Sequence, residues 1–294
     1  MFTKNSDEIT RQYFDSIMIS TRYLDSDIPD ISTEFFGKSF STPVTTAALS
    51  HLHKICDNAM VEFALGAKNA DALHFYGMGS DEELESILET GASTVKIIKP
   101  HEDDDEIFRR IEHAKRTGAF AIGMDIDHCV SPDGGYDVVM GLKMHTKTTG
   151  QISEYVKACG NIPFIVKGVL SLEDAVKSLE AGASGIVVSH HHGMMDYMTP
   201  PLLMLPEIVR EVGYSMKIFV DCCIESGFDA YKCLALGADG VSVGRALMDP
   251  LKDGALGVTE KINKINNELR MIMARTGART VKDIEPSTLR FRNF

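Results

Sequence analysis

The feature that most constrains the fold of this chain is a regular alternation of short apolar segments with longer amphipathic ones. Eight segments are rich in β-branched and other apolar residues and have the length of buried parallel strands. They are residues 42–49, 70–76, 93–99, 119–127, 163–169, 185–189, 217–222 and 240–244. Each is followed by a segment of helical character, as in a closed (β/α)8 barrel. The sequence therefore predicts an α/β fold of the TIM-barrel class, with a doubly wound open sheet as the alternative.

The amphipathic segments carry helix signals at both ends. Residues 80–91 begin with Ser80, have Glu83 three residues later, which is the pattern of a capping box, and end at a glycine. Residues 171–183 and 226–238 also begin with a serine and contain a glycine near the end. Because single (β/α)8 barrels have about 250 residues, we expect residues 1–294 to form a single domain. No G-x-G-x-x-G motif follows the first strand, which disfavours a dinucleotide-binding open sheet.

Composition excludes several classes of function. The formal net charge is −12, which disfavours nucleic acid as a partner because its phosphates repel an acidic surface. No apolar run approaches the roughly 20 residues of a membrane span, and the N-terminal residues lack the apolar core of a signal peptide. The six cysteines form no C-x-x-C pair. We therefore expect a cytoplasmic protein that acts on a small-molecule substrate, without nucleic acid or membrane partners.

Polar residues follow the predicted strands at the end where barrel enzymes build their active sites. They are Asp125 and Asp127 after the fourth strand, Lys167 after the fifth, Ser189 and His190 to His192 after the sixth, Asp221 after the seventh, and Gly244 and Arg245 after the eighth. The loops after strands seven and eight commonly bind phosphate groups. A glycine lets the backbone approach a phosphate and an arginine can pair with it, so Gly244 and Arg245 predict a phosphorylated ligand.

The three consecutive histidines allow three interpretations. One of them could be a catalytic base, since a histidine oriented by a carboxylate can take up a proton near neutral pH. The strand alternation would instead place His190 and His192 on one side, where Asp127, His128 and Cys129 could complete a metal shell. The third interpretation is a barrel that binds a phosphorylated ligand without turnover. The long glycine-rich segment 128–150 is a further candidate for a lid or a disordered loop.

Three segments of the C-terminal half resemble one enzyme family. They are PFIVKGVLSLEDAVKSLEAGASGIVVSHHHG, DYMTPPLLMLPEIV and FVDCCIESGFDAYKCLALGADGVSVGRAL. They are similar to the FMN-dependent 2-hydroxy acid oxidases and dehydrogenases, such as glycolate oxidase and lactate oxidase. The resemblance extends more weakly from residue 8 to residue 284 and covers nearly the whole chain. It implies a TIM barrel that binds FMN, contains no metal and forms a homo-oligomer, usually a tetramer.

Several site residues follow from this resemblance, position by position. The lysine at the flavin N1 and O2 edge corresponds to Lys167. The catalytic base corresponds to His191, with His192 as the alternative, and the aspartate that hydrogen-bonds it corresponds to Asp127. The cofactor-binding positions fall at Ala47, Ala48, Asp125, Lys167, Ser189, Asp221, Cys223, Gly244 and Arg245.

The chain also departs from the family pattern at the substrate and phosphate positions. One substrate-binding arginine falls at Met194 or Met195, and the other has no counterpart in residues 131–136. An active-site tyrosine falls at about Lys99, and an arginine near the phosphate falls at Glu225. We assign Lys99, His192 and Met194 as the substrate-binding candidates. Because the carboxylate-binding arginines are gone, the sequence predicts a substrate other than a simple 2-hydroxy acid.

Overall fold

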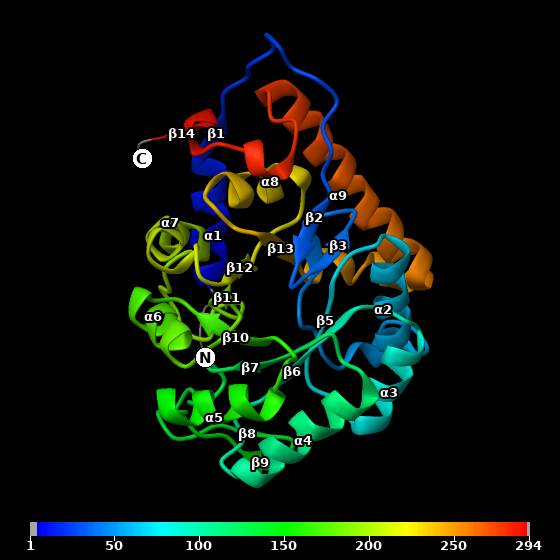
Figure 1. Ribbon diagram of the computed structural model, residues 1–294, viewed down its shortest axis with the longest axis vertical. Coiled ribbons are helices and arrows are strands. Elements are labelled where there is room, and N and C mark those ends of the chain that lie inside the picture. The colour runs from blue at the N-terminus through cyan, green and yellow to red at the C-terminus, as the bar shows by residue number, and fades with distance from the viewer. Residues whose placement is uncertain (1–4, 293–294) are drawn as a thin grey trace.

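The computed structural model describes residues 5–292, and its centre is a ring of parallel strands enclosed by helices (Figure 1). The strands are β4 (Val44–Thr46), β5 (His74–Tyr76), β6 (Thr94–Ile98), β7 (Ala121–Asp125), β10 (Phe164–Val169), β11 (Gly185–Val188), β12 (Lys217–Val220) and β13 (Gly240–Val243). Their order in the sheet is β4-β13-β12-β11-β10-β7-β6-β5. Each of the eight segments predicted from the sequence contains one of these strands.

Backbone hydrogen bonds between the two outer strands of this order close the barrel. The N–H of Thr46 donates to the carbonyl of Leu73 at 3.1 Å, and the N–H of Gly77 donates to the carbonyl of Leu49 at 3.1 Å. Both bonds join the segment of β4 to that of β5. The sheet therefore has no free edge here, which confirms the barrel and excludes the open sheet.

Helices cover the outside of the barrel. They are α2 (Ala59–Asn69), α3 (Asp81–Glu89), α4 (Asp104–Thr117), α5 (Thr149–Cys159), α6 (Leu172–Glu180), α7 (Pro201–Val212), α8 (Gly227–Ala235) and α9 (Gly254–Thr276), with short 3-10 helices at Leu52–Lys54, Arg245–Leu247, Pro250–Asp253, Val281–Asp283 and Pro286–Thr288. Ser80, Ser171 and Ser226 accept the expected capping hydrogen bonds. The reciprocal half of the predicted capping box at Ser80 is absent, because the carboxylate of Glu83 accepts the hydroxyl of Tyr76 at 2.6 Å instead.

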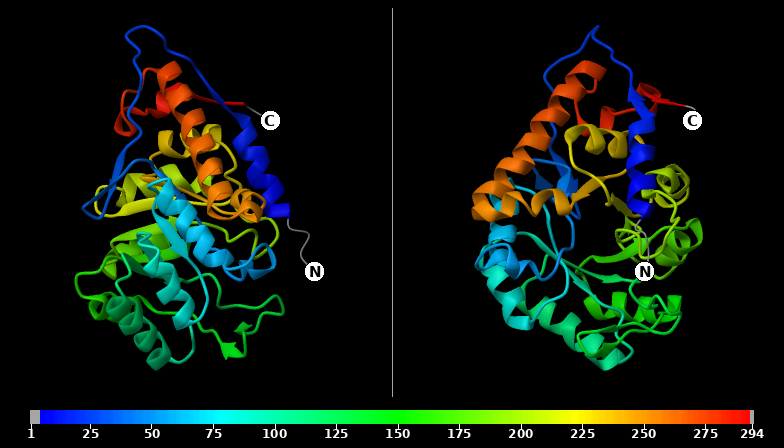
Figure 2. Two further views of the ribbon diagram at one scale, coloured as in Figure 1. Left: turned by 90° about the vertical axis from the view of Figure 1, so that its right-hand side faces the viewer. Right: turned by 180° about the vertical axis from the view of Figure 1, so that it is seen from behind.

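An N-terminal helix and three small antiparallel pairs complete the fold. Helix α1 (Asn5–Ser16) contacts α7, and β1 (Ile17–Ile19) pairs with β14 (Leu289–Phe291), so the N-terminal and C-terminal segments lie side by side (Figure 2). The hairpin of β2 (Thr33–Phe35) and β3 (Lys38–Phe40) lies at the amino ends of the barrel strands. A second hairpin, β8 (Val138–Val139) and β9 (Leu142–Lys143), gives the glycine-rich segment 128–150 a defined structure.

The barrel interior changes character from one end to the other. Its amino-terminal part is filled by Phe35, Phe40, Leu73, Phe75, Val95, Ile97, Ala121, Ile165, Val187 and Phe219. Side chains alternate along a strand, so the residues two positions further along point inward as well. After Ile97, Ile165 and Phe219 these are Lys99, Lys167 and Asp221. The apolar core therefore ends below a layer of inward-pointing charges at the carboxyl end of the barrel.

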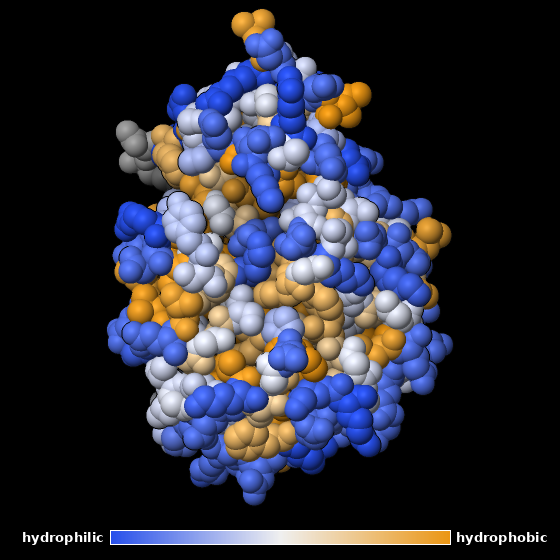
Figure 3. Space-filling view, viewed as in Figure 1, coloured by the Kyte–Doolittle hydropathy of each residue, from blue (hydrophilic) through white to orange (hydrophobic). Residues whose placement is uncertain are grey.

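The outer surface is mainly hydrophilic around the rim of the face shown in Figure 3, and hydrophobic residues are more frequent toward its middle. A search of the described residues, 5–292, finds no helix that is long and apolar enough to cross a membrane.

Candidate active site

A buried ion-pair cluster occupies the carboxyl end of the barrel. The Lys99 Nζ lies 2.6 Å from Asp125 Oδ2, and the Lys167 Nζ lies 3.0 Å from Asp125 Oδ1. The Lys167 Nζ also lies 3.9 Å from Asp221 Oδ2. All four side chains are at least nine-tenths buried. Two positive and two negative charges therefore compensate one another in this layer, as buried charges require.

The pKa values of these groups keep the cluster ionised. Burial alone would raise the pKa of the Asp125 carboxyl, but Lys167 and Lys99 lower it well below its usual range. Burial would lower the pKa of the Lys167 ammonium, but Asp125 and Asp221 raise it above its usual value. The pKa of Asp221 is lowered in the same way, because Lys167 outweighs the effect of burial. Lys167 thus remains a cation at neutral pH.

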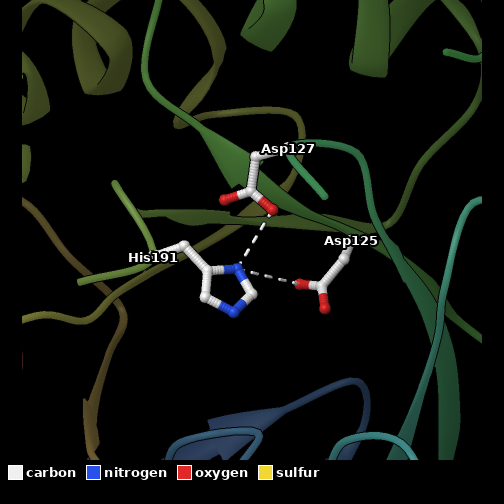
Figure 4. A group of neighbouring side chains, drawn as sticks. All are labelled: Asp125, Asp127 and His191. Atoms are coloured by element: carbon white, nitrogen blue, oxygen red, sulfur yellow. Dashed lines mark hydrogen bonds and ion pairs between the residues drawn. The ribbon is translucent and has the colours of Figure 1, made fainter. Parts of the chain in front are cut away.

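His191 lies beside this cluster with its Nδ1 directed at two carboxylates (Figure 4). The distance from His191 Nδ1 to Asp127 Oδ1 is 3.1 Å, and that to Asp125 Oδ1 is 3.9 Å. Because a carboxylate only accepts, the short contact places the proton of the neutral imidazole on Nδ1. The Lys167 Nζ lies 3.5 Å from the same nitrogen. Because the ammonium is also a donor, it interacts with the protonated Nδ1 through its charge and not through a hydrogen bond. The arrangement leaves Nε2 free of a proton, as a base requires.

The backbone after β11 leaves the extended conformation where the three histidines lie. The strand ends at Val188, and both His191 and His192 have positive φ angles, 49° and 59°. Ser189 stabilises this turn, because its Oγ accepts the N–H of His191 at 3.0 Å. Side-chain alternation applies only to extended backbone. Alternation therefore does not set these directions, yet His190 and His192 both contact α1, at Thr10 and Asp7, while His191 contacts Asp127.

His190 has a structural role. Its Nδ1 accepts the N–H of Gly193 at 3.1 Å, so its Nε2 carries the proton and donates to Thr10 Oγ1 on α1 at 2.7 Å. The side chain is fully buried, and burial lowers its pKa. His190 therefore stays neutral and uses both ring nitrogens to anchor the loop to α1.

His192 points toward the predicted phosphate site. It lines a cavity together with Ala47, Gly244 and Arg245, and its Nδ1 lies 3.7 Å from Asp7 Oδ1. Burial lowers its pKa to about 4, so the ring is neutral at pH 7. This position is on the phosphate side of the mouth, away from Asp127.

The structure does not assemble the predicted metal site. Cys129 Sγ donates to the carbonyl of Ile126, and His128 Nδ1 lies 3.0 Å from Asp137 Oδ2. Within residues 5–292, the one group of three metal-type ligands within reach of each other is Asp125, Asp127 and His191. Lys99 and Lys167 already neutralise Asp125, and a cation placed there would be repelled by both.

The phosphate cup is a second hollow of the mouth, next to the ion-pair cluster. We use this name for the cavity lined by Ala47, His192, Asp221, Cys222, Cys223, Ile224, Glu225, Ser242, Gly244, Arg245 and Ala246. It opens toward a larger cavity of about 590 Å³ that Asp7, Arg11 and Lys261 also line. Arg245 supplies a guanidinium, and the small residues Ala47 and Gly244 lie beside it in the lining of the cup.

These residues fit the expected FMN. Lys167 is a permanent buried cation of the kind that suits the electron-rich edge of a flavin ring, and the phosphate cup contains an arginine for the phosphate. Asp221 lies between them, since it contacts Lys167 and lines the cup, and Ser189 Oγ lies 3.6 Å from the Sγ of Cys222, another residue of the cup. Ala48 packs against the interior apolar cluster. One contact disfavours the fit: Asp7 Oδ2 lies 2.7 Å from an Arg245 Nη, so a carboxylate already pairs with the arginine that the phosphate would need.

Two contributors to the site were not anticipated from the sequence, and a third, His128, was anticipated only as a metal ligand. Thr10 and Asp7 come from α1, whose distance from the site in the chain gives no signal of contact. The ring of His128 packs edge to face against that of His191, with centroids 5.1 Å apart. Of these, only His128 was a candidate, because it follows the fourth strand.

The substrate candidates differ in their surroundings. The ammonium of Lys99 is held by Asp125 at 2.6 Å, so its charge is already compensated. Met194 is half-buried, and its backbone N–H donates to the carbonyl of His190. The side chain of the neighbouring Met195 is 56% exposed. The positions of the two family arginines therefore carry no positive charge in this chain.

Comparison with known proteins agrees with this geometry. The family model for FMN-dependent dehydrogenase matches residues 3–161 and 151–291. An L-lactate oxidase of Lactobacillus jensenii is 30% identical over 300 residues, which cover 91% of this chain and 73% of that protein. Glycolate oxidase 2 of Oryza sativa subsp. indica is 26% identical over 320 residues, which cover 96% of this chain and 85% of that protein.

Solved structures show the same fold. A lactate oxidase of Pediococcus acidilactici, described as putative, superimposes with a TM-score of 0.91 at 24% identity and covers 99% of this chain and 88% of that chain. A mandelate oxidase mutant with a C4a-OH-FMN adduct superimposes with a TM-score of 0.89 at 25% identity and covers 98% of this chain and 92% of that chain. Given these matches and a mouth that suits a flavin, the chain belongs to the FMN-dependent dehydrogenase family and is an FMN-dependent oxidoreductase.

Proposed function

We propose that this protein oxidises or reduces a small substrate other than a simple 2-hydroxy acid, with His191 as the base and Asp127 as the residue that orients it. The observation that carries the proposal is the 3.1 Å contact between His191 Nδ1 and Asp127 Oδ1, beside a buried lysine. We further propose that the single domain of residues 1–294 forms a homotetramer in the cytoplasm, as the family resemblance implies.

His191 would take the proton that leaves the substrate. Its Nε2 accepts the proton, and the imidazolium that forms has Asp127 at 3.1 Å and Asp125 at 3.9 Å from Nδ1 to stabilise its charge. Asp127 also keeps Nδ1 protonated, which holds the ring in the productive tautomer. FMN would supply the acceptor for a hydride from the substrate carbon whose hydroxyl or amino group gives up that proton. Lys167 would hold the ring edge of the cofactor, and its phosphate would lie in the phosphate cup beside Gly244 and Arg245.

The surroundings of His191 disfavour a small carboxylate substrate. A carboxylate that enters a partly dry site loses hydration, and arginines usually replace it by bidentate hydrogen bonds. Here the candidate positions hold Met194 and residues 131–136, which contain no arginine. Lys99 is a point charge that Asp125 already compensates. We therefore propose a neutral, amine-bearing or larger apolar substrate, contacted by Lys99 and Met194, whereas His192 lies in the phosphate cup.

Anaerobic flavin bleaching tests this function. The FMN-loaded protein is mixed with a panel of hydroxy acids, amines and alcohols, and the loss of flavin absorbance is followed. We expect bleaching by an amine or a larger alcohol, and little bleaching by glycolate or lactate. Rapid bleaching by either of these two acids would contradict the proposed substrate class.

Variants of the site test the proposed base. We expect His191→Ala to slow bleaching by a factor of about 10² to 10⁴, the usual contribution of a general base. Asp127→Asn should also slow it, because an amide can present its NH₂ to Nδ1 and favour the wrong tautomer. His53→Ala, at an exposed histidine, is the control and should bleach at the wild-type rate. If His191→Ala bleaches at the wild-type rate, His191 is not the base.

A further inference from the structure

Helix α1 places a carboxylate on the arginine of the phosphate cup. Asp7 Oδ2 lies 2.7 Å from Arg245 Nη2, and the Asp7 side chain is only 17% exposed. Two other residues of the mouth contact the same carboxylate. His192 Nδ1 lies 3.7 Å from Asp7 Oδ1, and the Sγ of Cys223 donates to Asp7 Oδ1 at 3.5 Å. Asp7 therefore occupies the place on the Arg245 guanidinium that a phosphate group would take.

The other cations of the surrounding cavity also have protein partners. Arg11 pairs with Asp229 at 2.8 Å and donates to the carbonyl of Cys223 at 3.1 Å. The Lys261 Nζ donates to the carbonyl of Glu225 at 2.9 Å. The cavity lining contains the acidic residues Asp7, Glu8 and Glu225 beside the basic residues Arg11, Arg245 and Lys261. Its formal charge is thus balanced before any phosphate enters.

We propose that Asp7 sets the cofactor specificity of this protein by competing with the FMN phosphate for Arg245. A phosphate that enters the cup must replace Asp7 on the guanidinium and then lie beside two carboxylates, Asp7 and Glu225. Both effects reduce the gain from the charge-assisted hydrogen bonds that an arginine normally offers a phosphate. The ring system meets Lys167 and the ion-pair cluster instead, which Asp7 does not contact. The protein therefore binds flavin mainly through the ring and distinguishes FMN from riboflavin weakly.

Equilibrium binding of the two flavins to the wild-type apoprotein is the first measurement. Riboflavin carries the same ring and lacks the phosphate, so the ratio of the two dissociation constants reports the contribution of the phosphate. Quenching of flavin fluorescence gives both constants without any catalysis. We expect riboflavin to bind less than about tenfold more weakly than FMN, which corresponds to less than about 1.4 kcal/mol.

Asp7→Asn is the second measurement. Removal of one negative charge frees Arg245, so the dissociation constant of FMN should fall by about tenfold or more, while that of riboflavin should hardly change. Glu8→Gln is the matched control, because Glu8 is an exposed neighbour on the same helix and lines the same cavity. It should leave the ratio of the two constants near the wild-type value.

A double-mutant cycle with Arg245→Gln shows whether Asp7 acts through the arginine. In the wild-type background, Arg245→Gln should change FMN binding little, because the arginine is already engaged. In the Asp7→Asn background it should abolish the gain in FMN affinity. Circular dichroism checks that each variant is folded.

Three results would overturn the inference. One is a wild-type preference for FMN far above tenfold, and another is a large loss of FMN affinity in Arg245→Gln alone. Both can be obtained even if Asp7→Asn fails to fold. The third is an Asp7→Asn variant that binds FMN and riboflavin with an unchanged ratio. None of these measurements involves His191. They therefore test the role of Asp7 independently of the proposed proton transfer.

Discussion

Gly168 is the residue on which the position of Asp127 depends. It lies at a register shift of β10 between Lys167 and Val169, with a φ of +90°. A Cβ atom at this position would lie 2.4 Å from Asp127 Cγ, which is closer than atoms can approach. The carboxylate that contacts His191 therefore needs a glycine in the neighbouring strand. At the scale of single residues, the bulge next to the lysine is part of the site.

We predict that Gly168→Ala lowers kcat strongly and the free energy of unfolding only moderately. Displacement of Asp127 should lower kcat by about 10- to 100-fold, since a shift of about 1 Å at a catalytic group costs this much. The strain of alanine at positive φ should also lower the free energy of unfolding by about 1–2 kcal/mol. Steady-state kinetics and urea unfolding measure the two effects.

Gly118→Ala provides the control for backbone strain. Gly118 has the same φ of +90°, and no atom lies within 4 Å of the position that its Cβ would occupy. It caps the C-terminus of α4, away from the mouth. This variant should lose similar stability with an unchanged kcat, and an equal loss of kcat in both variants would contradict the role of Gly168.

At the scale of elements, α1 fixes the loop that follows β11. Thr10 binds His190 from one side, and Ser6 Oγ donates to the carbonyl of Met195 at 2.7 Å further along the loop. His191 and His192 both have positive φ, which is unfavourable for residues with a side chain. The contacts with α1 thus hold a strained turn in place. The loop that carries His191 is thus held by a helix that precedes the barrel in the chain.

We predict that Thr10→Val lowers the free energy of unfolding by about 1–3 kcal/mol, because it leaves the buried Nε2–H of His190 without an acceptor. The two side chains have nearly the same shape, so packing should change little. Chemical denaturation measures the effect. Thr21→Val, at an exposed threonine, is the control and should change stability by less than about 0.5 kcal/mol. Equal stability of both variants would show that the Thr10 contact contributes nothing.

At the scale of the whole molecule, buried histidines make stability depend on pH. Burial lowers the pKa of His74 to about 3, and that of His101 and of His192 to about 4. The unfolded chain has histidines with a pKa near 6.5 and therefore binds more protons than the native state between these values. The free energy of unfolding must consequently fall as pH decreases from 6.5 toward 4, and it reaches its full value above pH 6.5.

We predict a slope of up to about 1.4 kcal/mol per pH unit from His74, which is the most deeply buried of the three. Urea unfolding between pH 5 and pH 7 measures it, in a range where carboxyl groups of the unfolded chain stay mostly ionised. His74→Gln should reduce the slope by this amount relative to wild type. The same slope in both proteins would contradict the neutral state of His74.

The alternation of apolar strands with amphipathic helices was sufficient to predict the barrel and the place of each of its eight strands, because these elements carry their own periodicity and caps. The short antiparallel pairs outside the barrel were not predicted. The rule that active sites lie at the carboxyl ends of barrel strands also selected Asp125, Asp127, Lys167 and Asp221. These predictions depend on residues close together in the chain. The left-handed turn at His191 and His192 could not be predicted in this way, since no local pattern in the sequence marks it.

The sequence by itself therefore determined the fold, the family and the group of charges at the mouth. Only the tertiary structure decided which histidine meets Asp127, that Lys99 is already compensated by Asp125, and that Asp7 reaches Arg245. These contacts join residues that lie 26 to 238 positions apart. Local periodicity carries no information about such distant pairs, because they form only when the closed barrel and α1 bring the chain segments together.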